Sequence, residues 1–131
     1  MGKAGEAPQP VLVVDDDLEM RRVLADFLRA EGFRVDQAGD AEEAMRRVGD
    51  TRYASVILDN HLPGESGLGI LPRLRSLAPG IPVILVTTIG DERLHELAFA
   101  RGAYDLLLKP FSLDDLVEVL RSAAEHAASG T

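Results

Sequence analysis

The feature that most constrains this chain is a run of four apolar residues, Val11–Val14, followed directly by Asp15, Asp16 and Asp17. A continuous run of mostly β-branched residues is typical of a strand that is buried on both faces of a parallel sheet. Unpaired charge is costly to bury, so the strand must end where the acids begin. The acids are therefore expected at the C-terminal edge of the sheet, where ligands bind in open α/β folds.

The composition indicates one ordinary globular domain. The chain has 131 residues, 46% of them hydrophobic and 27% charged, which is enough for a sizeable core. It has no cysteine, so disulfides, thiolate catalysis and zinc–cysteine sites are excluded. No apolar run is long enough to span a bilayer and no secretion signal is seen, so we expect a cytoplasmic protein without membrane attachment. The formal charge of −8 argues against direct contact between this domain and nucleic acid, whose phosphates would repel it.

Strand signals alternate with helix signals along the chain. Apolar runs typical of strands cover residues 11–14, 33–35, 54–58, 82–86 and 106–108. Apolar residues with helical spacing cover residues 20–28, 41–48, 68–77, 91–101 and 113–124. Five alternations without a hairpin signal predict an α/β fold: a single-domain, doubly wound parallel sheet with right-handed crossovers. We expect a flexible segment over residues 1–9, the domain over 10–125, and a tail or the start of a linker over 126–131.

The helical segments carry caps, apolar stripes and one internal proline. Asp17, Asp40 and Ser112 each precede a helical segment and are the expected N-caps. Pro72 lies inside the third helix and predicts a bend or a later helix start, because proline lacks a backbone donor. The stripes expected to face the core are Met20, Val23, Leu24, Phe27 and Leu28 in the first helix, Leu68, Leu71, Leu74 and Leu77 in the third, and Leu113, Leu116, Val117, Leu120 and Ala124 in the last.

Residues whose side chains can react or bind a ligand follow four of the predicted strands. Asp15 and Asp16 follow the first strand, Asp59 the third, Thr87 the fourth and Lys109 the fifth. Because parallel strands end at the same edge of a sheet, we expect these groups to converge there. Each also has a plain structural alternative when it is taken alone. The acids can cap a helix, the lysine can lie solvated in a loop, and the threonine can be a strand-end hydroxyl.

The energetics of such a cluster favour a ligand-binding role. Two carboxylates about 5 Å apart repel each other by roughly 3 kcal/mol at an effective dielectric constant of about 20. Lys109 alone would leave three carboxylates undercompensated, whereas a divalent cation that prefers oxygen ligands, such as Mg²⁺, would neutralise them. An ammonium and a hydroxyl beside the metal are groups that hold phosphoryl oxygens, and a carboxylate can itself act as a nucleophile. The pattern therefore predicts Mg²⁺-assisted phosphorylation of an aspartate.

Four motifs resemble those of a receiver domain of a two-component response regulator. They are VLVVDDD, LDNHLPGESG, VILVTT and GAYDLLLKPF, which occur in that order and cover about residues 10–124. The resemblance implies a flavodoxin-like, five-stranded sheet of order 2-1-3-4-5, with the first and third strands adjacent at the switch point. The GAYD segment is similar to that of receivers from nitrogen-regulation and dicarboxylate-transport regulators.

The resemblance also implies roles for the residues that react with the phosphoryl group. Asp59 would accept it from the phosphohistidine of a sensor histidine kinase or from a phosphotransfer protein. Thr87 would hydrogen-bond to it, and Lys109 would pair with it. The Lys109–Pro110 peptide is expected to be cis, which turns the lysine inward. The chain would then be a regulatory phospho-acceptor and not an enzyme acting on other molecules.

The metal ligands and the readout follow from the same resemblance. Asp16 and Asp59 would bind Mg²⁺ directly, the backbone carbonyl of His61 would be a third ligand, and Asp15 would act through water. Phosphorylation would repack the face formed by the last two helices and the last strand, which would bind a downstream output domain or protein. The chain would be a monomer or a phosphorylation-dependent homodimer.

Two departures from the family pattern bear on this mechanism. Leu106 stands where the family usually has Tyr or Phe, so the readout is expected to be blunted or to be carried by Tyr104. His61 lies two residues after the acceptor and Ile89 two residues after Thr87. A hypothesis for these residues is that the histidine ring, together with Ile89, affects the attacking water and so the lifetime of the phosphoryl group.

Two other functions compete with the phospho-accepting receiver. A small aspartate-dependent phosphatase could use the Asp15-x-Asp17 spacing, but Asp17 leads into a helix and Lys109-Pro110 fits the receiver pattern. A degenerate receiver could bind partners without phosphorylation, but the complete set of acids, Thr87 and Lys109 argues against it.

Overall fold

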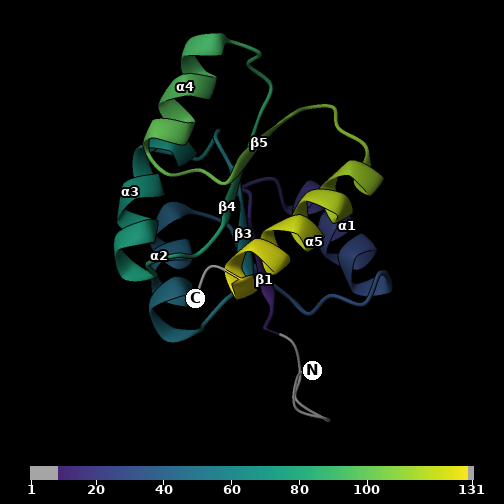
Figure 1. Ribbon diagram of the computed structural model, residues 1–131. Helices are drawn as coiled ribbons and strands as arrows, with labels where there is room; N and C mark the ends of the chain where they lie inside the picture. Colours follow the sequence, from purple (N-terminus) through teal and green to yellow (C-terminus); the bar gives the residue numbers. More distant parts are fainter. Residues whose placement is uncertain (1–8, 130–131) are drawn as a thin grey trace.

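Five strands alternate with five helices in the computed structural model, which describes residues 9–129 (Figure 1). The strands are β1 (Val11–Val14), β2 (Val35–Ala38), β3 (Ser55–Asp59), β4 (Val83–Thr87) and β5 (Asp105–Leu108). The helices are α1 (Leu18–Ala30), α2 (Ala41–Asp50), α3 (Gly67–Leu77), α4 (Glu92–Ala100) and α5 (Leu113–Ser129). The predicted alternation is thus confirmed for every element.

All strands pair in parallel in one sheet of order β2-β1-β3-β4-β5, which confirms the predicted topology. β1 pairs with β3 in a register that sets Val14 opposite Leu58. The residue that follows each of these is an aspartate: Asp15, directly after β1, and Asp59, the last residue of β3. The order and register of the sheet therefore bring the two acids side by side.

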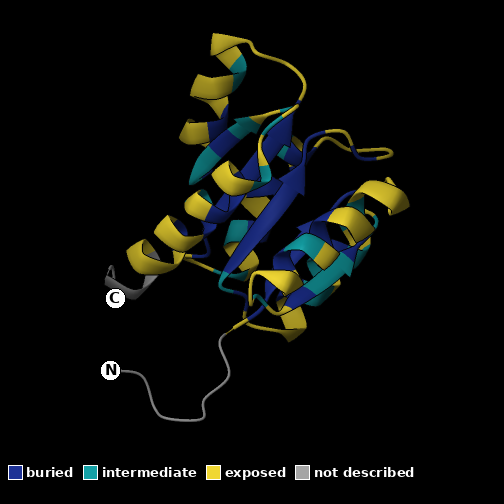
Figure 2. Cartoon of the chain, turned by 90° about the vertical axis from the view of Figure 1, so that its right-hand side faces the viewer, coloured by how far each residue is buried: buried dark blue, intermediate teal, exposed yellow. Residues whose placement is uncertain are grey.

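The sheet separates two apolar layers. On one face, α2 and α3 pack over a cluster that includes Leu12, Leu58 and Leu85. On the other face, α1 and α5 pack over a cluster that includes Val13 and Ile57 (Figure 1). Figure 2 shows the buried strands between helices whose outer sides are exposed. Along the part of the chain that the structure describes, no helix is long and apolar enough to cross a membrane.

The predicted caps are present at the helix starts. The carboxylate of Asp17 accepts hydrogen bonds from the first-turn amides of α1, and Asp40 accepts one from the amide of Glu43. The hydroxyl of Ser112 accepts a hydrogen bond from the amide of Asp115 at 2.9 Å. These acceptors satisfy backbone donors that a helix leaves unpaired in its first turn.

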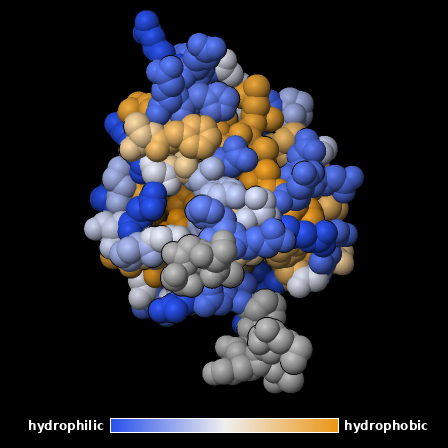
Figure 3. Space-filling view, in the orientation of Figure 1, coloured by the Kyte–Doolittle hydropathy of each residue, from blue (hydrophilic) through white to orange (hydrophobic). Residues whose placement is uncertain are grey.

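Some predicted core positions lie at the surface instead. Met20 and Val23 are 40% and 51% exposed, Leu77 is also exposed, and Ala123 is buried in place of Ala124. Met20 and Leu77 lie near helix ends, and for them the reason is length, because the four residues of β1 span about 13 Å whereas the thirteen of α1 span about 20 Å. The helix ends therefore project beyond the sheet, although they keep the same periodicity. Figure 3 shows one side of the molecule, where hydrophobic surface interrupts a largely hydrophilic exterior.

The C-terminal boundary differs from the prediction. Helix α5 continues to Ser129, so residues 126–129 of the segment expected as a tail or the start of a linker are helical. Ala127 and Ala128 have high helix propensity, and they extend the helix without an apolar stripe to signal it. Residues 1–8 of the expected N-terminal segment and residues 130–131 of the expected tail lie outside the described residues.

Helix α3 runs through Pro72, and a distant arginine compensates for the missing backbone donor. The helix begins at Gly67, so the later start predicted from the proline is wrong. Pro72 has no N–H for the carbonyl of Leu68, four residues earlier. The guanidinium of Arg101, at the end of α4, donates a hydrogen bond to this carbonyl at 3.0 Å.

This pairing predicts a coupling between Pro72 and Arg101. Arg101→Ala should lower the free energy of unfolding by about 1 kcal/mol, because the Leu68 carbonyl loses its partner. In a Pro72→Ala background the helix supplies the missing donor, so the same change should cost less. Urea denaturation of the four proteins in a double-mutant cycle measures the difference. An equal cost of Arg101→Ala in both backgrounds would contradict the compensation.

Candidate functional site

Three carboxylates converge at the edge where β1 and β3 end. Asp15 and Asp59 are 3% and 5% exposed, and Asp16 lies on the solvent side. One carboxylate oxygen from each residue lies within 4.8 Å of those of the other two. The structure therefore brings together the three acids that the strand-end pattern predicted. Asp17 is outside this group because its carboxylate caps α1.

Lys109 supplies positive charge to this cluster. Its Nζ lies 3.6 Å from Oδ2 of Asp59 and 3.9 Å from Oδ2 of Asp15. β4 lies between β5 and β3, so the long side chain must reach across a strand to make these contacts. The backbone amide of Lys109 donates to the carbonyl of Thr87 at 2.7 Å, which ties the start of the loop to β4. The Lys109–Pro110 peptide is cis, as predicted.

Asp15 is held by backbone contacts and is difficult to ionise. Its Oδ1 accepts a hydrogen bond from the amide of Asp17 at 2.9 Å, and Arg21 donates to its carbonyl oxygen at 2.7 Å. The pKa of Asp15 is raised from 3.8 to about 6, chiefly because burial disfavours the charged form. The charge of Asp59 adds to this increase in pKa, whereas the Asp17 amide and Lys109 oppose it. A buried carboxylate in this state favours the binding of a proton or a cation.

Asp59 is oriented by the loop that follows it. The amide of His61 donates to Asp59 Oδ1 at 3.1 Å, while Oδ2 is the oxygen near Lys109. Asn60 accepts a hydrogen bond from the amide of Leu68 through Oδ1 at 2.9 Å, which ties the loop to the start of α3. A Cβ at Gly67 would lie 2.5 Å from the Asp59 carbonyl oxygen, so this close approach requires glycine. The role of Gly67 was not predicted from its place among several turn-forming residues.

Thr87 and the two residues after it lie on the neighbouring strand end. Thr87 is fully buried, and its Oγ1 accepts a hydrogen bond from the amide of Ile89 at 3.1 Å. Since that bond uses the oxygen as an acceptor, the hydroxyl keeps its hydrogen for donation to a ligand. The ring Nε2 of His61 lies 3.3 Å from Oγ1 of Thr88. The ring therefore contacts Thr88, a residue that the sequence hypothesis did not include.

The donor set at this edge fits a divalent metal ion. Three carboxylates offer hard oxygen ligands close together, and two of them are buried with one ammonium beside them. Mg²⁺ binds through one or two carboxylates and keeps several waters, which suits a cluster with one solvent-facing member, Asp16. A metal ion bound there, with the Lys109 ammonium and the Thr87 hydroxyl, could in turn hold an anionic group.

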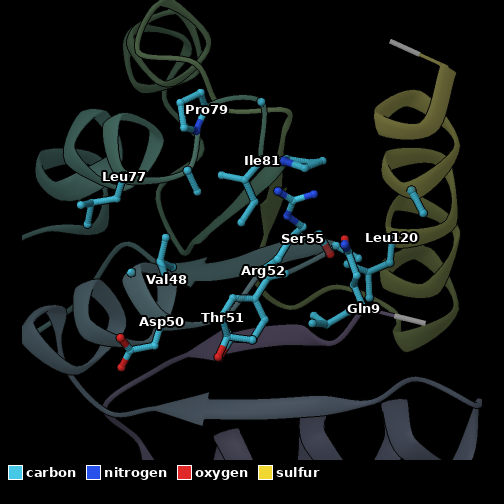
Figure 4. Close-up of a pocket in the computed structure, with 18 of the residues that line it drawn as sticks. Gln9, Val48, Asp50, Thr51, Arg52, Ser55, Leu77, Pro79, Ile81 and Leu120 are labelled. Atoms are coloured by element: carbon cyan, nitrogen blue, oxygen red, sulfur yellow. The ribbon is translucent and has the colours of Figure 1, made fainter. Parts of the chain in front are cut away.

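Two of the hollows on the surface border the acids. A pocket of about 380 Å³ is lined by Asp15, Asp59 and Lys109 together with apolar residues. A second, of about 490 Å³, lies between Asp16 and residues 60–66. A further hollow, of about 860 Å³, is lined by residues at the edge where the strands begin, and it contains none of the three clustered acids (Figure 4). The acid cluster and this hollow thus lie at opposite edges of the sheet.

Comparison with known proteins identifies a family match. The chain matches the family described as response regulator receiver domain over residues 11–121. It is 36% identical over 119 residues to the C4-dicarboxylate transport transcriptional regulatory protein DctD of Rhizobium meliloti (strain 1021), covering 91% of this chain and 26% of that protein. The chain spans about half or less of the length of the curated relatives that it matches.

Two solved structures are similar in both sequence and fold. The receiver domain of NtrX from Brucella abortus is 35% identical with a TM-score of 0.82, covering 88% of this chain and 98% of that one. A response regulator protein from Burkholderia pseudomallei, solved with a phosphorylated aspartic acid, calcium ion and citrate, is 26% identical with a TM-score of 0.82. That match covers 93% of this chain and 72% of the other. The matches to DctD and NtrX confirm the resemblance drawn from the GAYD segment.

The raised pKa of Asp15 predicts how stability changes with pH. The folded state binds more protons than the unfolded state between pH 3.8 and about 6, so the free energy of unfolding falls as pH rises through this range. Asp15→Asn removes the carboxylate that is costly to ionise. It should raise the free energy of unfolding by about 1–3 kcal/mol at a pH of about 8 and by much less at a pH of about 5.

Urea denaturation at the two pH values, in buffer with a chelator, measures this effect. Asp50→Asn is the matched control, because Asp50 is an exposed acid that lines the hollow at the opposite edge. The control variant should show no gain that depends on pH in this range. An Asp15→Asn gain of equal size at both pH values would contradict the assignment of the titration to Asp15.

Proposed function

This chain belongs to the family of response regulator receiver domains, and on that premise we propose that Asp59 accepts a phosphoryl group from a histidine kinase or a phosphotransfer protein. The observation that carries the proposal is the pairing of a buried Asp59 carboxylate with the Lys109 ammonium, next to a second buried acid, Asp15. The phosphorylated aspartic acid in the Burkholderia pseudomallei relative supports the same chemistry. The domain proper is proposed to cover residues 10–125.

The proposed transfer is a direct displacement at phosphorus. A carboxylate oxygen of Asp59 forms a bond to phosphorus while the bond from phosphorus to the donor nitrogen breaks. The electron pair of that bond leaves with the donor ring, whose other nitrogen carries a proton, so the leaving group is neutral imidazole. The product is an aspartyl phosphate. Lys109 compensates negative charge on the phosphoryl oxygens, and the Thr87 hydroxyl donates a hydrogen bond to one of them. The His61 amide keeps Asp59 Oδ1 oriented during the approach of the donor.

A metal ion is the proposed partner of this reaction. Asp16 and Asp59 would hold Mg²⁺ directly, with the His61 carbonyl as a further ligand and Asp15 acting through water. When bound, the ion supplies positive charge that neutralises the carboxylates and the phosphoryl oxygens. The cluster of three acids supports this role, since Lys109 alone leaves it with excess negative charge.

The proposed readout lies on α4, β5 and α5. Helix α4 buries a single residue, Ala98, so little apolar packing holds it in place. Leu106 packs in the core beneath this region, and the hydroxyls of Tyr104 and Ser122 are hydrogen-bonded at 2.8 Å between β5 and α5. We propose that phosphorylation repacks this face, which then binds an output domain or protein, in a monomer or a phosphorylation-dependent homodimer. We propose that the readout is blunted or is carried by Tyr104, which packs on the α5 side of the sheet, because Leu106 stands in place of the usual aromatic residue.

The proposed function predicts an adduct on one residue. Incubation with acetyl phosphate and MgCl₂, followed by intact-protein mass spectrometry, should show one added phosphoryl group. Asp59→Asn should abolish the adduct because the nucleophilic oxygen is lost, and a chelator should abolish it because the cluster needs its cation. Asp50→Asn, which removes an exposed acid at the opposite edge of the sheet, should leave the adduct unchanged.

Other outcomes would point to the competing functions. Steady release of phosphate from varied esters that survives Asp59→Asn would favour an aspartate-dependent phosphatase. No adduct with any donor would favour a receiver that binds partners without phosphorylation. The capping role of Asp17 already argues against a phosphatase that uses the Asp15-x-Asp17 spacing.

A further inference from the structure

An apolar pocket opens beside the acceptor, and the transfer chemistry above leaves most of it unused. It has a volume of about 380 Å³ and lies between the ends of the central strands, the first turns of α1 and the start of α5. This is within the range of pockets that hold small molecules. Its lining is formed by Val13, Val14, Asp15, Met20, Val23, Leu24, Ile57, Asp59, Val86, Thr88, Lys109, Pro110, Phe111 and Leu113.

Two facing walls of the pocket are apolar. Met20 and Val23 of α1 form one wall, and both side chains are exposed. Phe111 and Leu113 form the other wall, where the chain enters α5. Apolar side chains that border a pocket gain stability when a ligand removes them from water.

The inner end of the pocket is charged and reactive. Asp59 and Lys109 both line it, with the Lys109 ammonium 3.6 Å from the Asp59 carboxylate. Because the acids outnumber the ammonium, a matching ligand has an apolar body for the two walls and an anionic head that would bind Lys109 together with the cation of the proposed metal site. Under the proposed function, this anionic head is an activated phosphoryl group, which is transferred to Asp59.

We propose that this pocket selects small-molecule phosphodonors, namely acyl phosphates whose acyl group is apolar and larger than acetyl. This inference rests on the proposed function and adds the substrate class of the same site. A carboxylate oxygen of Asp59 bonds to phosphorus, and the bond from phosphorus to the acyl oxygen breaks. The electron pair leaves on the carboxylate product, so no proton or further reactant is needed. The apolar acyl group lies against Met20 and Val23 while its phosphoryl group faces Asp59 and Lys109.

The direct test compares acetyl phosphate with butyryl phosphate as donors. Their leaving groups are chemically alike, so the ratio of second-order rates of adduct formation reports contact with the two additional methylenes. Burial of two methylenes should make butyryl phosphate about tenfold faster. The rates are measured by intact-protein mass spectrometry in the presence of MgCl₂.

Variants of the apolar wall separate this pocket from other causes of a donor preference. The double variant Met20→Gln, Val23→Thr makes the wall polar at exposed positions, and the ratio should fall to about one. Val23→Thr alone is the milder alternative if the double variant folds poorly. Leu18→Gln is the matched control, because Leu18 is an exposed apolar residue of the same helix that does not line the pocket. Its ratio should remain about tenfold.

A second readout detects binding without transfer. In Asp59→Asn protein labelled with ¹³C at the methionine methyl groups, butyryl phosphate should shift the Met20 signal more than acetyl phosphate does. Met45 packs against the cluster on the opposite face of the sheet, so its methyl signal is the internal control and should not move. Equal shifts at Met20 and Met45 would contradict binding in this pocket.

The outcomes distinguish this inference from the proposed function. Adducts from both donors at equal rates would overturn the inference and leave the proposed function standing. The pocket would then hold another occupant, such as an apolar side chain of a donor protein. A preference for butyryl phosphate that survives the double variant would also overturn the inference. No adduct from either donor would instead contradict the proposed function.

Discussion

Repulsion among three carboxylates is the constraint on which this structure depends. The register of β1 against β3 sets Asp15 beside Asp59, and Asp16 completes the cluster from the solvent side. Lys109 must cross β4 to reach it, and burial raises the pKa of Asp15 to about 6. An arrangement that costs folding stability in this way is typical of a functional site, where charge is held ready for a ligand. A divalent cation would relieve this repulsion through its charge and its preference for oxygen ligands, and the proposed phosphoryl group would share that cation.

Backbone contacts hold the cluster in place against this repulsion. Asp59 is oriented by the His61 amide, and the loop after it closes against α3 through Asn60 and the close approach at Gly67. The start of α3 is in turn tied to the end of α4 by the hydrogen bond from Arg101 to the Leu68 carbonyl. These bonds form a physical connection between the acceptor loop and the helix on the proposed readout face.

The strand ends could be predicted from the sequence because the signals are local. Four apolar residues before Asp15 determine where β1 ends. Because parallel strands end at the same edge of the sheet, the three acids and Lys109 meet there as expected. Asp17 precedes an apolar helical pattern, and its capping role follows from that position. The overall sheet order required the family resemblance, since alternation alone does not specify which strands are neighbours.

The parts that could not be predicted depend on contacts between distant segments. Periodicity placed Met20 and Val23 in the core, but it carries no information on where the sheet beneath a helix ends. Pro72 predicted a bend or a later helix start. Its compensation by Arg101 could not be predicted, because Arg101 lies 33 residues from Leu68 in sequence. The contact of the His61 ring with Thr88 likewise joins two loops whose proximity only the folded chain reveals.

The central claim, that the three carboxylates form a metal site, is tested most directly by thermal unfolding with and without MgCl₂. A cation that binds the folded cluster with a dissociation constant of about 1 mM should raise the melting temperature by about 5 °C at about 10 mM. Asp16→Asn should abolish this increase, whereas Asp50→Asn, with the same change in net charge, should retain it. An increase of equal size in wild type and Asp16→Asn, or none in wild type, would contradict the claim.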